Sequence, residues 1–355
     1  MSVSDSASKI LETAESAPAH EALLEVLGTS REGILVVRED TRIIASNIAA
    51  YEAFGRGDAL EGKRLSEIIR NLDLHEAFHR ALQANSSSDI KLETTAQKRK
   101  YEVHIAPIRL EGVQHAIGFF YDITQVEHLE TVRQEFLSNI SHELRTPLTS
   151  IMAFVETLED GAIDDHENNR RFLKVIRKNA GRMHELIADI LELSLIESGN
   201  VSISVSQVRL RSHVEEVFAS LSKKALARDI SLINQVPDGT IISVDPVRLE
   251  QMLVNLVDNA IKFNRESGTV TIAHDRNERS DIISVTDTGE GILSDHLQRI
   301  FERFYRADRA RSREIGGTGL GLAIVKHLAR LHGGEVSVES ILSQGTTFFI
   351  ELPVK

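Results

Sequence analysis

Two consecutive helical patterns in the middle of the sequence restrict its fold more than any other feature. Apolar residues recur at intervals of three, four or seven positions from Leu129 to Ile151, and again from Phe172 to Leu193. Each pattern extends over about 30 residues, too many for one helix to bury its apolar stripe alone. The sequence therefore predicts a helical hairpin that completes a four-helix bundle with a second copy, as a homodimer. An intramolecular coiled-coil linker is the alternative.

The composition excludes several classes of protein. No apolar stretch approaches the roughly 18 to 20 residues of a membrane span, and the N-terminus lacks the basic start and apolar block of a signal peptide. We therefore expect a cytoplasmic protein without a membrane span. The absence of Cys excludes disulfides, thiolate metal sites and a thiol nucleophile. A net charge of −12 argues against nucleic acid as a partner, because phosphate neutralisation needs clustered Lys and Arg.

Changes of pattern divide the chain into four segments of a multidomain α+β protein. Residues 1–21 form an N-terminal tail without a strong period, and residues 125–200 form the hairpin. Residues 22–124 alternate short strand-like and helical runs, with strands expected near 33–37, 42–44, 90–95, 100–109 and 115–122. Residues 201–355 form a second α/β-type domain, whose first strand is predicted from the alternation of Val201, Ile203 and Val205.

An exposed imidazole and a helix breaker lie close together in the first long helix. His142 is two residues from both Ile140 and Leu144, which at about 100° per residue places it opposite the apolar stripe. A neutral imidazole is a competent nucleophile, and the adjacent Glu143 can accept or orient its other ring proton. Thr146 lies one turn further on the same face, and Pro147 allows the helix to bend. An ordinary histidine on a solvated helix face is the alternative.

The last segment contains three motifs that suit a nucleotide. In the first, polar residues share one face of an otherwise apolar helix: Gln251, Asn255, Asn259 and Lys262. Carboxamide oxygens can complete a Mg²⁺ shell, and a lysine can meet phosphate. A polar outward helix face is the alternative.

The second motif follows a strand-like run, and the third opens a helix. Asp287 at a strand end can accept a hydrogen bond from the adenine amine, while Gly289 and Gly291 allow close approach of the backbone. A tight turn is the plain alternative. Glycines at the N-terminus of a helix expose amide N–H groups to phosphate, and the third motif is such a loop, formed by Gly316, Gly317, Thr318, Gly319, Leu320, Gly321 and Leu322.

Aromatic and basic residues fill the stretch between these two motifs. Phe301 and Phe304 are expected to form an aromatic pair, beside clustered arginines at positions 303, 306, 309, 311 and 313. A nucleic-acid patch is one interpretation, but the cluster is short and lies in an acidic protein. A mobile lid that meets triphosphate charge explains it better.

These motifs together identify a family. SHELRTPL, residues 141–148, closely resembles the phosphoacceptor box of sensor histidine kinases of two-component systems. The resemblance implies that His142 is phosphorylated, that Glu143 assists it, and that Thr146 supports removal of phosphate from the partner regulator.

The order of the last motifs resembles the ATP-binding domain shared by histidine kinases, gyrase, mismatch-repair ATPases and a class of heat-shock chaperones. The resemblance implies an α/β sandwich that binds ATP with Mg²⁺, the metal lying between Asn255 and Asn259. Asp287 would read adenine beside Thr346, and Gly289 and Gly291 would shape the pocket. The remaining nucleotide contacts implied are Lys262, Phe304, Arg306, Gly317, Thr318, Gly319, Leu320 and Gly321.

The N-terminal segment resembles a PAS sensor domain. The resemblance lies in residues 32–55 and 118–129, including the exit Asp122-Ile123-Thr124 into the following helix. Without Cys, a light-driven flavin–thiol adduct is excluded. His75 and His79, at i and i+4, make haem ligation conceivable, although a solvated helix edge explains them equally well. The ligand of this domain is unknown, or there is none.

We therefore expect a homodimeric protein-histidine kinase. It would autophosphorylate on His142 from Mg-ATP, transfer the phosphoryl group to an Asp of a separate response regulator, and also dephosphorylate that regulator. Two rivals share the pocket: a scaffold that ATP switches without phosphoryl transfer, and an ATP-hydrolysing chaperone or DNA-repair relative. Neither rival predicts SHELRTPL on a dimer-forming helix.

Overall fold

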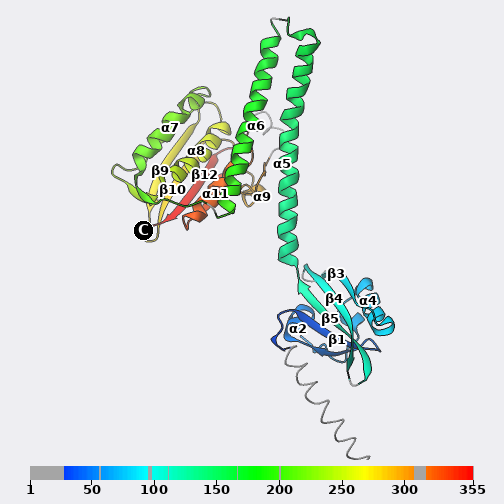
Figure 1. Ribbon diagram of the computed structural model, residues 1–355. Coiled ribbons are helices and arrows are strands. Elements are labelled where there is room, and N and C mark those ends of the chain that lie inside the picture. The colour runs from blue at the N-terminus through cyan, green and yellow to red at the C-terminus, as the bar shows by residue number, and fades with distance from the viewer. Residues whose placement is uncertain are drawn as a thin grey trace, which may run out of the picture. The chain divides into compact units, whose positions relative to one another are not determined.

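The protein is described by a computed structural model that covers residues 28–55, 57–94, 98–110, 112–165, 167–199, 201–307 and 317–354. The predicted tail, residues 1–21, and the lid residues Arg309, Arg311, Arg313 and Gly316 lie outside the described residues. The chain forms two compact units, Met1–Gln134 and Glu135–Lys355 (Figure 1). Within the described parts, no helix is both long and apolar enough to cross a membrane.

The first unit is built on an antiparallel sheet of five strands in the order β2-β1-β5-β4-β3. The strands are β1 (Gly33–Arg38), β2 (Ile43–Ser46), β3 (Ser88–Thr94), β4 (Arg99–Leu110) and β5 (Val113–Asp122). The helices are α2 (Ile48–Phe54), α3 (Leu65–Ile68) and α4 (Leu72–Ala84). These bounds confirm the five expected strands.

The sheet of the first unit buries side chains on both faces. Leu35 and Val37 of β1 pack among residues of α2 and α4, including Phe54 and Phe78. The alternate residues of β1 point to the opposite face, where Ile34 and Val36 form a smaller cluster with Ile117. Because successive strand residues point to opposite faces, burial of both faces explains the unbroken apolar run of this strand.

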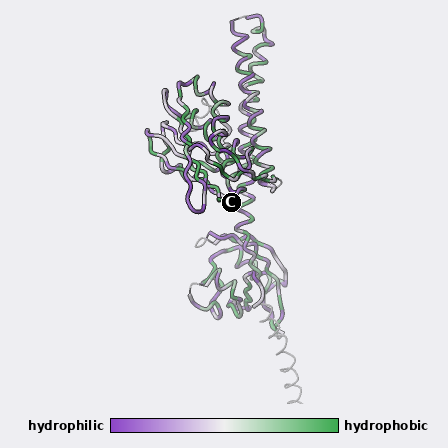
Figure 2. The backbone as a smooth tube through the Cα atoms, turned by 90° about the vertical axis from the view of Figure 1, so that its left-hand side faces the viewer, coloured by the Kyte–Doolittle hydropathy of each residue, from purple (hydrophilic) through white to green (hydrophobic). Residues whose placement is uncertain are grey.

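Two long helices form the predicted hairpin. Helix α5 (Thr124–Thr157) continues through Pro147, and α6 (Asn169–Glu197) returns after a π-helical turn at Leu158–Ala162, where Gly161 has a φ of 107°. Hydrophobic residues recur along both helices (Figure 2). Many of these apolar side chains are exposed in the single chain: Leu137, Leu148, Met152, Leu173, Ile187, Leu191 and Leu195.

The rest of the second unit is a two-layer arrangement of helices on a mixed sheet. The sheet order is β11-β12-β10-β9-β7, with β7 parallel to β9 and the other pairs antiparallel. The strands are β7 (Ser231–Asn234), β9 (Thr269–Arg276), β10 (Ser280–Asp287), β11 (Glu335–Ile341) and β12 (Gly345–Pro353). The helices are α7 (Leu210–Leu226), α8 (Pro246–Lys262), α9 (Ser294–Leu297) and α11 (Gly321–Leu331).

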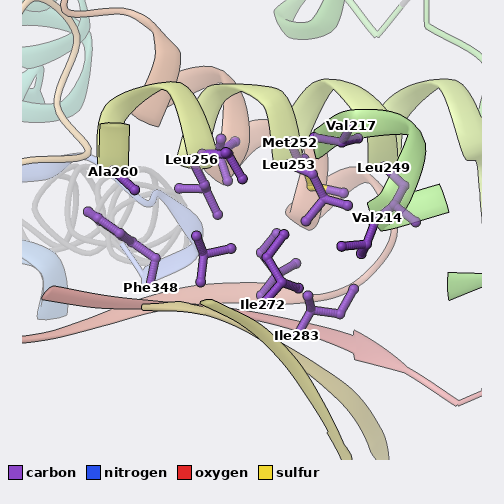
Figure 3. Close-up of a cluster of buried hydrophobic side chains, with 14 of the residues drawn as sticks. Val214, Val217, Leu249, Met252, Leu253, Leu256, Ala260, Ile272, Ile283 and Phe348 are labelled. Atoms are coloured by element: carbon purple, nitrogen blue, oxygen red, sulfur yellow. The ribbon is translucent and has the colours of Figure 1, made fainter. Parts of the chain in front are cut away.

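The core of this domain lies between the sheet and helices α7, α8 and α11. In Figure 3, side chains of α7 and α8 point toward Ile272, Ile283 and Phe348 of the sheet. Strand β10 alternates buried and half-buried residues, which places Ile283, Val285 and Asp287 on the same face. This alternation carries the Asp287 carboxyl group into the interior at the end of the strand.

The strand predicted at residues 201–205 is wrong. No strand covers these residues, and β6 is Ser206–Arg209, paired with β8 (Ile241–Val244) in a small separate sheet. In this segment the Ser204 N–H donates to the side chain of Asp245 and not to a partner strand. Asp245 in turn caps the N-terminus of α8. Val205 is exposed, so its place in the apolar alternation does not reflect burial.

Candidate functional site

His142 lies on the exposed face of α5, as its position relative to the apolar stripe predicts. The hydroxyl of Thr146, one turn later, donates to the backbone carbonyl of His142 at 3.2 Å. A shallow groove along the helix is lined by His142, Arg145, Thr146, Thr149, Ser150 and Ala153. The imidazole is therefore accessible to a second protein or to a nucleotide.

Glu143 is held by two arginines. One of its carboxylate oxygens accepts from Arg182 of α6 at 2.9 Å and lies 3.6 Å from the guanidinium of Arg306. Sequence reasoning assigned Glu143 to the imidazole of His142, but the contacts of this carboxylate in the structure are the two guanidinium groups. Arg182 was missed, because it is one of six basic residues on α6 and nothing in the local sequence distinguishes it from the other five.

Asp287 ends β10 with its carboxyl group buried. The side chain is 7% exposed and accepts a hydrogen bond from the Gly289 N–H at 2.8 Å. Burial raises the pKa of this carboxyl from 3.8 to about 6, although hydrogen bonds from the backbone of Gly289 and Thr346 act in the opposite direction. Thr346 is the register partner of Asp287 on β12 and is also buried. The predicted adenine-side residues therefore lie together.

The two glycines after Asp287 are required by close backbone packing. A Cβ atom at Gly289 would collide with the carbonyl oxygen of Phe263, at the end of α8. Gly291 has a φ of 72°, and a Cβ atom there would collide with the backbone of Ile341. The glycines bring the Asp287 loop against both α8 and the end of β11.

We predict that Gly291→Ala lowers the free energy of unfolding by about 2–4 kcal/mol, since it adds a clash to a left-handed backbone conformation. Gly239→Ala is the matched control, because Gly239 has a φ of 77° but nothing within 4 Å of the place that a Cβ atom would take. The control is expected to cost only about 1 kcal/mol. Urea unfolding of both variants measures the difference, and equal losses would contradict the packing argument.

The polar face of α8 contains two amide side chains that suit a cation. Among the described residues, the side chains of Asn255 and Asn259 form no hydrogen bond. The side-chain oxygen of Asn255 faces Gly321, the first residue of α11, where a Cβ atom would lie 3.2 Å away. Two amides with uncommitted oxygens, one turn apart and beside a helix N-terminus, fit a hard cation that is bound to phosphate.

Lys262 is paired within its own helix. Its ammonium lies 2.5 Å from the Asp258 carboxylate, which also accepts from Lys224 at 2.6 Å. Gln251, on the same face, accepts from Arg248 at 3.2 Å. A role for Lys262 at phosphate therefore requires that it leaves Asp258.

Phe304 and Arg306 support the glycine-rich loop. The Phe304 N–H donates to the Gly319 carbonyl at 2.9 Å, and the Arg306 guanidinium donates to the Gly317 carbonyl. Leu320 is fully buried and anchors the loop. The expected pairing of Phe301 with Phe304 is wrong, because each ring has another aromatic partner. Phe301 packs on Phe348 at 6.2 Å, and Phe304 packs on Phe136 of α5 at 5.7 Å.

An acidic stripe on α6 contacts the domain formed by the sheet β11-β12-β10-β9-β7 and its helices. Asp189 accepts from the Thr318 hydroxyl of the glycine-rich loop at 2.6 Å, and burial raises the pKa of Asp189. Glu192 pairs with Arg248 at 2.7 Å, and Glu197 pairs with Arg303 at 2.5 Å. Sequence reasoning missed the stripe, although acids at 185, 189 and 192 recur at helical spacing and were a usable signal.

His75 and His79, the histidine pair on α4 of the N-terminal domain, do not point into its core. On α4 the neighbouring Leu74 and Phe78 are the buried residues, whereas His79 is exposed. A ring nitrogen of His75 lies 2.7 Å from the Ile69 carbonyl oxygen, so the imidazole caps the backbone locally. A solvated helix edge therefore describes this pair better than haem ligation.

Three family descriptions match successive parts of the chain. Residues 31–125 match a PAS domain, and residues 132–199 match the "His Kinase A (phospho-acceptor) domain". Residues 244–355 match the "Histidine kinase-, DNA gyrase B-, and HSP90-like ATPase" family. The order of these matches is the order of the motifs described above.

Curated relatives resemble nearly the whole chain. The sensor histidine kinase WalK of Bacillus subtilis is 33% identical over 343 residues, which cover 94% of this chain and 55% of WalK. Sensor protein SrrB of Staphylococcus aureus is 29% identical over 323 residues, covering 91% of this chain and 54% of SrrB. The chain thus spans about half the length of these relatives.

A solved structure shares the fold. The histidine kinase ThkA, crystallised in complex with the response regulator protein TrrA, aligns with a TM-score of 0.52 at 21% identity. The alignment covers 94% of this chain and 98% of that chain.

Proposed function

Because the chain belongs to the sensor histidine kinases of two-component systems, we propose that it phosphorylates itself on His142 and passes the phosphoryl group to an aspartate of a response regulator. The proposal rests on one observation: the exposed histidine and the glycine-rich loop lie in the same compact unit. His142 is exposed on α5, and the next residue, Glu143, contacts Arg306 beside the glycine-rich loop. An acceptor whose neighbouring residue contacts Arg306, beside the glycine-rich loop, suits phosphoryl transfer better than it suits a scaffold.

ATP is the phosphoryl donor in this proposal. The ionised Asp287 carboxylate accepts from the adenine amine, and Thr346 lies beside it. Asn255 and Asn259 would hold Mg²⁺, which neutralises charge on the phosphates when it is bound. The backbone N–H groups of residues 317–321, at the N-terminus of α11, favour the negative charge of the phosphates.

The chemical step forms one bond and breaks one. The neutral imidazole of His142 attacks the γ-phosphorus, and the bond from that phosphorus to the bridging oxygen breaks, leaving ADP. The other ring nitrogen then carries a proton that a carboxylate can accept or orient. Glu143 takes that role once it exchanges Arg182 and Arg306 for the imidazole.

The three predicted domains have distinct roles in the proposal. Residues 22–124 sense a signal with or without a bound ligand, residues 125–200 dimerise and carry His142, and residues 201–355 bind ATP. The exposed apolar residues of the hairpin, including Leu148, Met152 and Leu191, suit a second copy that completes a four-helix bundle. Because ATP and the receiver are cytoplasmic, we place the reaction in the cytoplasm.

Thr146 is proposed to serve the removal of phosphate from the regulator. Its hydroxyl is exposed one turn from His142, within reach of a receiver docked on this face. Thr146→Ala is expected to lower the rate of regulator dephosphorylation by about 10²-fold while autophosphorylation stays within about twofold. Assays of both activities with a purified receiver domain test this. Equal loss of the two activities would contradict the assignment.

The proposed function is tested by incubating the purified chain with γ-labelled ATP and Mg²⁺. A phosphohistidine is expected, so the label should be acid-labile, alkali-stable and transferable to a receiver domain. ATP hydrolysis without labelling of the protein would favour the rival interpretation, an ATP-hydrolysing chaperone or DNA-repair protein. ATP binding without hydrolysis or label would favour a nucleotide-switched scaffold.

A further inference from the structure

Arg228 lies outside every motif of the sequence and reaches the end of the helix that bears the metal-side residues. It follows α7 by two residues, and its side chain is half-buried. Its guanidinium donates to the carbonyl oxygens of Ile261 at 2.8 Å, of Lys262, and of Asn264 at 3.0 Å. One side chain therefore satisfies two carbonyls in the last turn of α8 and one just beyond it.

Those carbonyls need an external partner. The last four C=O groups of a helix have no donor within it, and the C-terminus has partial negative charge. The planar fork of a guanidinium matches several carbonyls at once, which an ammonium group does less well. Arg228 thus fixes the position of the last turn of α8, which bears Asn259 and Lys262.

The same helix end also contacts the adenine side of the pocket. The Phe263 carbonyl accepts from the Glu290 N–H at 3.4 Å and faces Gly289. The buried Asn264 side chain donates to the Thr269 carbonyl at 3.0 Å and accepts from the Thr288 hydroxyl at 3.2 Å. Phe263 and Asn264 therefore join the end of α8 to the loop that follows Asp287.

We propose that Arg228 is a positioning residue for the nucleotide, which sets the distance between the metal side of the pocket on α8 and the adenine side on β10. The inference rests on the proposed function, because it assigns Asn255 and Asn259 to the metal and Asp287 to adenine. Arg228 acts on the nucleotide through α8.

The affinity for a ligand depends on Arg228 when that ligand occupies both the metal side and the adenine side of the pocket. When two subsites are held at the correct separation, binding at one raises the effective concentration of the ligand at the other. If the end of α8 is held less firmly, this advantage is reduced, although each subsite keeps its own side chains. A ligand that occupies only the adenine side is then little affected.

The experiment compares Arg228→Ala, Arg228→Lys and Arg211→Ala by calorimetric titration of the whole chain. The two ligands are adenosine and the Mg²⁺ complex of a non-hydrolysable ATP analogue. Arg211 is the matched control, because this α7 arginine also donates to a backbone carbonyl, that of Val236, and its ion pairs are with Glu215 and Asp238, away from the pocket. Circular dichroism and thermal unfolding establish that each variant is folded.

For Arg228→Ala, the Kd of the Mg²⁺–ATP analogue is expected to rise about tenfold, while that of adenosine stays within about twofold. Arg228→Lys should recover part of the loss, and Arg211→Ala should bind both ligands as the wild type does. If Arg228→Ala does not fold, the same split between the two ligands is expected, at a smaller size, in Arg228→Lys.

Two results would overturn the inference. Unchanged affinity for both ligands in a folded Arg228 variant would make the residue purely structural, and equal losses would mean that the adenine pocket itself is damaged. Failure of the wild-type chain to bind the ATP analogue would instead refute the proposed function. The two failures are therefore distinguishable.

Discussion

Replacing His142 with Gln is expected to abolish phosphorylation of the chain while leaving ATP binding and folding unchanged. The glutamine amide is similar in size and polarity, but its nitrogen is not a nucleophile at neutral pH. His142 is exposed, so its replacement leaves the core of the hairpin intact. Incubation with γ-labelled ATP, followed by measurement of protein-bound label, should give no signal above background for this variant.

The matched control for this variant is His184→Gln. His184 is an exposed histidine of α6, the other helix of the same hairpin. The control variant should be labelled like the wild type. Label that persists in His142→Gln, or that disappears in both variants, would refute the assignment of His142 as the acceptor.

Replacing Asp287 with Asn is expected to weaken ATP binding by about 10²-fold and, at the same time, to stabilise the fold without nucleotide. The adenine amine donates a hydrogen bond. In the variant, the NH₂ group of the new asparagine faces this amine, so two buried donors meet and neither has an acceptor. The Gly289 N–H donates a hydrogen bond to Asp287 at 2.8 Å, and the asparagine oxygen can still accept this bond. Binding of the Mg²⁺–ATP complex to both proteins, measured by titration, tests the first effect.

The stabilising effect follows from the pKa of Asp287, which burial raises from 3.8 to about 6. Between these two values the native state binds more protons than the unfolded state, so the free energy of unfolding falls as the pH rises through this window. At pH 7 the buried charge then costs roughly 3 kcal/mol, which Asp287→Asn removes. Urea unfolding at pH 5 and pH 7.5 should show a gain at the higher pH about twice the gain at pH 5, where the unfolded carboxyl is already ionised.

The affinity for ATP should depend on pH for the same reason. Adenine binding favours the ionised carboxylate, so affinity of the wild type is expected to fall below pH 6, and that of Asp287→Asn to stay flat. Asp275→Asn, an exposed change on the neighbouring strand β9, serves as the control. An Asp287→Asn protein that is less stable than the wild type at pH 7.5 would contradict the burial argument.

Local periodicity explains most of what could be predicted from the sequence. The place of His142 on the exposed face depends only on its angular offset from Ile140 and Leu144, which the helix itself fixes. The loop after Asp287 was predicted because close backbone approach and a left-handed φ favour glycine, as Gly291 confirms. These inferences need only neighbours within a few residues along the chain.

Predictions that required a distant partner were less successful. The alternation at residues 201–205 predicted a strand, but strand formation needs a partner strand, and β8 pairs only with residues 206–209. Phe301 and Phe304 are close in sequence, yet their rings pack on Phe348 and Phe136. The partner of an aromatic ring is decided by tertiary packing, which spacing along the sequence does not predict.

The sequence by itself determined the order of the parts, the exposed histidine and the residue types of the proposed nucleotide pocket, because helix period, strand alternation and glycine geometry are local properties. Only the tertiary structure decided that Glu143 lies between Arg182 and Arg306, that Asp189 contacts Thr318, and that Arg228 caps α8. Each of these contacts joins residues that are far apart in the chain. Their energies depend on burial and on distances between charges, which exist only once the chain has folded.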